Sequence, residues 1–231
     1  MLRPKKKLTR REIKQDKLIT AYFKIYDRIY NYRKQIIIGA VALAVVALGL
    51  ILYYNNLQAE NERAMTELGK VYPVYDQENY QRAIDGIPER GIMGLRDIAV
   101  NFKRTEAGKI ATFYLANAYY HLGQYDEAYR YFDDFRGSDN LLRASALAGK
   151  AAIYEIRGEH PQAAELFERA ATRFGQTAIT PENLKHAGRN YLEAGNAAKA
   201  LRIFEKIQND YPEAAISRDV ERFIAQIKVS L

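Results

Sequence analysis

The stretch AYYHLGQYDEAYRYF, residues 118–132, decides the fold. Within it a tyrosine, a glycine, an alanine and a phenylalanine follow the spacing Tyr-x3-Gly-x4-Ala-x3-Phe. The same spacing returns twice along the chain, at intervals of 35 and 37 residues. The three sets are Tyr119, Gly123, Ala128 and Phe132; Tyr154, Gly158, Ala163 and Phe167; and Tyr191, Gly195, Ala200 and Phe204. A period of this length is typical of a protein built from stacked supersecondary units.

Each unit is predicted to be a pair of antiparallel helices. The tyrosine falls late in the first helix, and the glycine lets the chain turn because it has no Cβ. The small alanine allows the second helix to approach the first closely, and the phenylalanine fills the remaining space. Since a single hairpin cannot bury its apolar face, the units are expected to stack into a superhelix.

The unit resembles the tetratricopeptide repeat, and Pro212 stands where the closing proline of that repeat falls. The resemblance implies an all-α fold with three repeats over residues 108–212 and a capping helix over 213–231. Tyr80 and Ala83 repeat the spacing of Tyr125 and Ala128. Residues 55–107 are therefore predicted to be an irregular helical region that contains a degenerate repeat.

Three helices are expected in this irregular region. The first begins at Leu57, and Pro73 should end or kink it because proline lacks the amide hydrogen that a helix needs. The second is short, begins with Tyr80 and Ala83, and is broken at residues 85–88. The third is amphipathic, since its apolar residues from Ile92 to Phe102 recur at spacings of three and four, and it is expected to end near Arg104.

The run IIIGAVALAVVALGLILYY, residues 36–54, contains no charge. As a helix it would reach roughly 28 Å, close to the hydrocarbon thickness of a bilayer. A buried core helix usually keeps a polar edge, and this run has none. A cleaved signal peptide would need a small-x-small site after the run, whereas Tyr53 and Tyr54 follow and suit a membrane interface. The prediction is one uncleaved transmembrane helix.

Residues 1–35 form a basic arm before this run. This arm has twelve Lys and Arg residues and three acidic residues, which gives it a net charge of +9, and the rest of the chain carries about −2. The positive-inside rule places the arm in the cytoplasm and the repeats across the membrane. The apolar stripe from Leu18 to Tyr32 predicts a basic amphipathic helix. It would contact anionic headgroups or a membrane partner, or else be a solvated arm that only fixes topology.

The sequence offers no catalytic constellation. It has no cysteine, and its three histidines fall at different repeat positions, so neither a metal site nor a cofactor is expected. Gly108-Lys109 and Gly149-Lys150 lack the remainder of a phosphate loop and are predicted to lie inside helices. The basic excess lies beside the apolar run rather than on a folded face, so no nucleic-acid partner is expected. These observations favour a binding protein and not an enzyme.

In the tetratricopeptide family, ligands lie in the groove formed by the first helix of each unit. The two-carboxylate clamp of the family needs lysine and asparagine at set positions, and only Asn117 is in place. The mixed apolar and charged groove suits an extended segment or a helix of another protein. The alternative is an ordinary surface. By the resemblance, the groove would hold Ile110, Phe113, Asn117, Tyr120 and His121 from the first unit, Ala148, Ala152, Glu155 and Ile156 from the second, and Lys185, Arg189, Leu192 and Glu193 from the third.

The order of a basic arm, one span and a repeat domain is similar to that of the single-span ancillary subunit of the bacterial Sec translocon. The repeat domain is also similar to that of a periplasmic cell-division coordinator, and the stretch RTEAGKIATFYLANAYYHLGQYDEA, residues 104–128, carries the likeness. It implies a scaffold in the bacterial inner membrane whose periplasmic domain holds translocon components, chaperones or exported chains. The alternative is a structural or assembly subunit of another inner-membrane complex, with a homo-oligomer left open.

Overall fold

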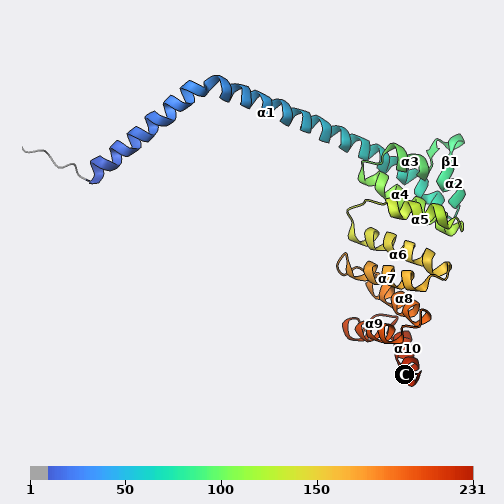
Figure 1. The fold of residues 1–231 in the computed structure, drawn as a ribbon. Helices are drawn as coiled ribbons and strands as arrows, with labels where there is room; N and C mark the ends of the chain where they lie inside the picture. The colour runs from blue at the N-terminus through green and yellow to red at the C-terminus, as the bar shows by residue number, and fades with distance from the viewer. Residues whose placement is uncertain (1–9, 231) are drawn as a thin grey trace, which may run out of the picture. The chain divides into compact units, whose positions relative to one another are not determined.

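The computed structural model describes residues 10–230 (Figure 1) and contains two compact units, residues 1–56 and 57–231, which are treated separately. The first nine residues of the predicted arm lie outside the described residues. The elements are α1 (Arg10–Asp76), α2 (Tyr80–Asp85), β1 (Gly86–Ile87), the 3-10 helix η1 (Pro88–Arg90), β2 (Ile92–Met93), α3 (Leu95–Asn101), α4 (Glu106–His121), α5 (Tyr125–Asp134), α6 (Asn140–Ile156), α7 (His160–Thr172), α8 (Thr180–Glu193), α9 (Ala197–Asp210) and α10 (Ser217–Ser230).

In the first unit, the described chain is wholly helical and belongs to α1. Its most apolar 18-residue window has a mean hydropathy of 2.8, and none of that window is buried in the structure. The large apolar side chains there are exposed, from Ile36 at 50% to Leu43 at 72%. By length and composition this helix fits a membrane span or a signal sequence. Before it, the rings of Tyr22, Tyr26 and Tyr30 stack in succession along one side of the helix.

The second unit begins with the last turns of α1. Ala64, Leu68 and Val71 recur at spacings of four and three, and all three side chains are buried. The helix passes Pro73 and ends at Asp76. This is possible because a proline removes only its own amide hydrogen bond, and one further turn can form beyond it.

The irregular region departs from the predicted helices at one point. Ile92 and Met93 do not open a helix but pair antiparallel with Gly86 and Ile87 as a two-residue hairpin. The reason lies in two glycines: a Cβ on Gly86 would lie 2.6 Å from the backbone nitrogen of Gly94, so only glycine allows these backbones to meet. The amphipathic helix α3 therefore starts at Leu95 rather than at Ile92.

The remaining helices form the predicted stack of hairpins, α4–α5, α6–α7 and α8–α9, closed by α10 (Figure 1). The motif residues take the expected places. Gly123, Gly158 and Gly195 adopt φ values of 74°, 73° and 76°, the left-handed conformation that suits glycine. The motif alanines are fully buried, and the phenylalanines are at most 4% exposed. The fold is thus all-α apart from the short hairpin: a long apolar N-terminal helix followed by stacked helical hairpins.

Two hydrophobic clusters hold the stack together. The first extends from the end of α1 to α6, and the second from α6 to α10. Helix α6 serves both, since Ile153 belongs to the first cluster and Ala151 to the second. Helix α10 buries Val220, Ile224 and Ile227 in the second cluster.

Candidate protein-binding groove

The first helices of three successive hairpins, α4, α6 and α8, line one cavity of about 460 Å³, which we call the groove. Its volume lies within the range of roughly 300–1,000 Å³ that ligand pockets occupy. Six of the residues predicted from the sequence line it: Asn117, Tyr120, Ala148, Ala152, Glu155 and Ile156.

Helix α6 forms the floor of the groove. Ala148, Ala152 and Glu155 are spaced by four and three residues, so they fall on one helix face. The two alanines leave room where larger side chains would fill the cavity. Gly149 of α6 also lines the groove, and a Cβ on this residue would lie 2.5 Å from the ring of Phe132. This glycine lets α6 approach the preceding hairpin closely.

One end of the groove is charged. His186 lies between two carboxylates, with its Nδ1 3.6 Å from Glu155 and its Nε2 3.7 Å from Glu182. Its ring stacks on Phe167 at a centroid distance of 4.9 Å. The neighbouring imidazole, helped by Asn190 and Arg189, holds the pKa of Glu155 below its ordinary value, although partial burial opposes this.

Two buried nitrogens in the groove have no hydrogen-bond partner among the described residues, Nδ1 of His186 and Nδ2 of Asn183. The 3.6 Å separation of His186 from Glu155 allows an ion pair but is too long for a hydrogen bond. Both atoms are shielded from solvent, so they mark the polar end of the cavity rather than an exposed donor surface.

The structure places the other predicted groove residues outside this cavity. Ile110 and Phe113 pack against the first hydrophobic cluster, and Leu192 packs against the second. The exposed ring of His121 stacks on Tyr80 at 4.7 Å. Three charged residues complete the set: Lys185, whose Nζ lies 2.7 Å from Glu182, and the exposed Arg189 and Glu193.

The groove also contains residues that the sequence did not single out. On α8 the lining residues are Glu182, Asn183 and His186, which precede the predicted Arg189 by one to two turns. The connection over residues 173–179 comes before α8, and Ile179 at its end lines the cavity as well. The sequence did contain a signal for these residues. Glu182, His186 and the predicted Arg189 are spaced by four and three residues, so they lie on one face of α8.

Among the residues that the structure describes, no three His, Asp or Glu side chains gather as a metal site would require. The arrangement offers a partly apolar floor and a charged end formed by Glu155, Glu182 and His186. It can bind a polypeptide through mixed contacts, as the helix-in-groove and extended-peptide modes do.

The fold and this site define a helical-hairpin scaffold, a class that binds proteins and is typically non-catalytic. Residues 111–138 and 186–214 match the tetratricopeptide repeat. A solved structure from Podosopora anserina, described as having "kinesin light chain nearly identical TPR-like repeats", superposes with a TM-score of 0.54 at 16% identity and covers 72% of this chain and 85% of that one. A second structure with the same description has the same score and identity and is covered over 86% of its length. A comparison with curated protein sequences finds no match.

The lowered pKa of Glu155 predicts a pH-dependent contribution to stability. A depressed pKa means that the unfolded state takes up the proton first as the pH falls, so the contribution is complete above the ordinary value of 4.5 and is lost below it. Glu155→Gln is expected to lower the free energy of unfolding at about pH 5.5, above the ordinary pKa of a glutamate, and to have a smaller effect at about pH 3. Urea denaturation at both pH values measures this difference. Glu127→Gln, on the exposed side of α5, is the control, and an equal pH dependence for both variants would contradict the prediction.

Proposed function

We propose that this chain is a membrane-anchored scaffold whose groove holds a segment of another protein. The observation that carries the proposal is the groove itself, in which two alanines leave space over α6 while Glu155, Glu182 and His186 form a charged end. An extended segment or a helix would place apolar side chains over Ala148 and Ala152 and polar groups toward the charged end.

The membrane part of the proposal is supported by the N-terminal helix. An 18-residue window with a mean hydropathy of 2.8 and no burial suits hydrocarbon rather than a protein core. The +9 arm before it favours a cytoplasmic N-terminus by the positive-inside rule, which would put the repeats in the periplasm of a bacterial inner membrane.

The partners that we propose are components of the Sec translocon, periplasmic chaperones or newly exported chains. The support is the order of arm, span and repeats, which is similar to that of the ancillary translocon subunit. In this view the arm and the span contact the channel, and the groove contacts exported chains.

Photocrosslinking from two positions tests this proposal. A photoreactive residue replaces Tyr120, which lines the groove, or Tyr26, which is 56% exposed on the arm. We expect Tyr120 to capture exported chains or chaperones and Tyr26 to capture a translocon component, because the two surfaces serve different partners. The same substitution at Gln226, exposed on α10 and outside the groove, is the control.

Two outcomes would contradict the proposed association with the Sec translocon. If both positions capture one fixed set of proteins that is unaffected by blocking export, the chain is a structural or assembly subunit of another complex. If neither position captures a translocon component or an exported chain, the proposed association with the translocon is wrong, and a structural subunit of another complex is the remaining interpretation.

A further inference from the structure

A second cavity, of about 430 Å³, lies between the end of α5, the first half of α6 and the end of α7. It is lined by five basic side chains and a single carboxylate, that of Asp133. Residues 57–231 together carry a net charge of about −2, whereas the residues that line this cavity are strongly positive in net charge. We call this cavity the basic pocket, and its cations are Arg136, Arg143, Lys150, Arg169 and Arg173.

The one carboxylate is already neutralised. Lys150 Nζ lies 2.5 Å from Asp133, and this contact holds the pKa of that carboxyl below its ordinary value. The same ammonium lies 4.8 Å from the centroid of the Tyr129 ring. Lys150 and Asp133 are thus a partnered pair, and the remaining charge of the pocket comes from its four arginines.

Among the described residues, no carboxylate lies within 4.0 Å of the four guanidinium groups, although Arg136 also helps to lower the pKa of Asp133 from a longer distance. The guanidinium groups of Arg143 and Arg173 lie 4.5 and 5.7 Å from the centroid of the Phe174 ring, which orients them without neutralising them. Arg136 donates hydrogen bonds to the backbone carbonyls of Asp133 and Phe135. Arg169, in the last turn of α7, is exposed.

Stabilisation of helix ends accounts for only part of this charge. Helices α5 and α7 end at Asp134 and Thr172, beside the pocket, and each C-terminus carries a partial charge of roughly −0.5. The two ends together offset about one of the four arginine charges. Since the rest stays uncompensated, the pocket is suited to an anionic ligand.

We propose that the basic pocket binds an acidic segment of a partner protein through its aspartate or glutamate side chains. Guanidinium groups bind carboxylates in a planar, bidentate geometry, and three or four around one cavity can hold more than one carboxylate. The apolar walls formed by Leu147 and Phe174 accept the methylene groups and backbone of such a segment.

A phosphate ligand fits the pocket less well. Phosphate sites commonly use the free amides of a helix N-terminus, whereas α5 and α7 contribute their C-terminal ends. The N-terminus of α6 is the nearest source of amides, but the Leu142 amide already donates to the side chain of Asp139. The pocket therefore offers side-chain cations rather than backbone donors.

The basic pocket is separate from the groove. The two cavities share one lining residue, Phe132, and different sides of α6 face them: Leu147 and Lys150 line the pocket, while Ala148 and Ala152 line the groove. The proposal thus goes beyond the groove-based function and does not depend on it.

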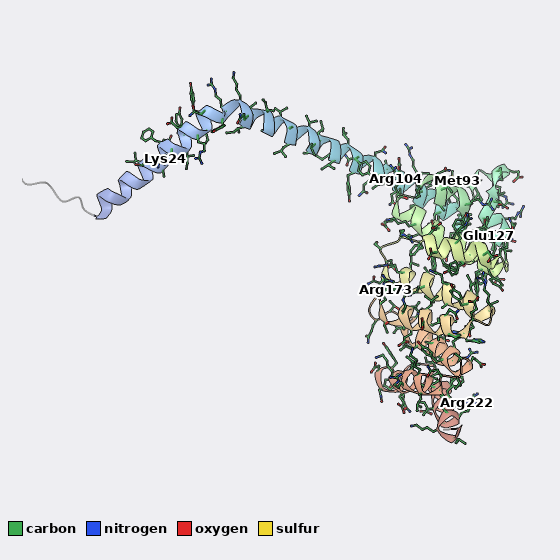
Figure 2. The ribbon with its side chains drawn as sticks, viewed as in Figure 1. Lys24, Met93, Arg104, Glu127, Arg173 and Arg222 are labelled. Carbon is green, nitrogen blue, oxygen red and sulfur yellow. The ribbon has the colours of Figure 1, made fainter. Side chains whose placement is uncertain are left out.

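The test measures binding of a fluorescent peptide of alternating glutamate and serine to the full chain in a non-ionic detergent, followed by fluorescence anisotropy. A pocket variant carries Arg143→Gln, Arg169→Gln and Arg173→Gln. A control variant carries Arg202→Gln, Arg218→Gln and Arg222→Gln, which removes equal charge from exposed positions outside the pocket. Figure 2 shows Arg173 at the side of the stack near α6 and α7, and Arg222 at its C-terminal end. Both variants keep the basic arm, so its attraction for the acidic peptide contributes equally to the two measured affinities.

We expect the pocket variant to bind the acidic peptide at least about tenfold more weakly than the wild-type chain, and the control variant to lose less than about twofold. A peptide in which glutamine replaces glutamate should not compete. Equal losses in the two variants would overturn the proposal, as would competition by pyrophosphate at concentrations equal to the peptide. Because the three arginines are exposed, the helical circular dichroism should be unchanged. The single variants Arg173→Gln and Arg222→Gln give the same comparison if a triple variant unfolds.

Discussion

Phe167→Ala is expected to lower the free energy of unfolding of residues 57–231 by about 3–5 kcal/mol. Phe167 is only 3% exposed, belongs to the second hydrophobic cluster and stacks on His186. Removing its ring leaves a cavity between the second and third hairpins, which the fixed helices around it cannot fill. Urea denaturation of residues 57–231, followed by helical circular dichroism, measures the loss.

The matched control is Leu141→Ala in α6, where the side chain is 40% exposed and belongs to neither cluster. This change should cost less than about 1 kcal/mol, as surface substitutions generally do. A loss below about 1 kcal/mol for Phe167→Ala itself would show that the repeated phenylalanines do not bury the interface between hairpins.

Gly108→Ala is the second change with a large expected effect. Alanine normally favours a helix over glycine by about 1 kcal/mol, but Gly108 is buried in the first turn of α4 against the preceding chain. A Cβ there would lie 2.0 Å from the carbonyl oxygen of Phe102, a backbone atom that cannot rotate away. We expect a net loss of about 1–3 kcal/mol or more, together with a shift of residues 102–105.

The same substitution at Gly69 should have the opposite sign. Gly69 is exposed in α1, and a Cβ there would meet nothing within 4 Å. Gly69→Ala is expected to stabilise residues 57–231 by about 0.5–1 kcal/mol. If both variants were stabilised, the close contact of α4 with Phe102 would be wrong.

The sequence predicted the hairpins well because each unit repeats the same local chemistry. The sequence pattern shows where a glycine must allow a turn, where an alanine must be small and where a phenylalanine must be buried. The structure confirms these roles at Gly158, Ala163 and Phe167. The short hairpin at β1 and β2 was missed because it depends on the approach of Gly86 to Gly94, a contact that no periodicity reveals.

The groove could be predicted only in part. On α4 and α6, where the hairpins follow one another with short connections, positions taken from the repeat pattern such as Tyr120 and Glu155 do line the cavity. On α8 the cavity is lined earlier in the helix, by Glu182 and His186. The basic pocket was not predicted, because its cations come from two helices, α6 and α7, and from the connections that follow α5 and α7, and their meeting depends on how neighbouring hairpins stack.

Helix α10 determines which surface the stack of hairpins presents at its end. A stack of like hairpins offers the next hairpin an apolar surface at its end, and an uncovered end would let chains add to one another without limit, as open-ended assemblies do. Helix α10 occupies that end with Val220, Ile224 and Ile227, while the exposed Glu221 and Arg222 point charge outward. Within the described residues, α10 thus covers the apolar surface that the α8–α9 hairpin would otherwise expose, and it replaces that surface with a charged one.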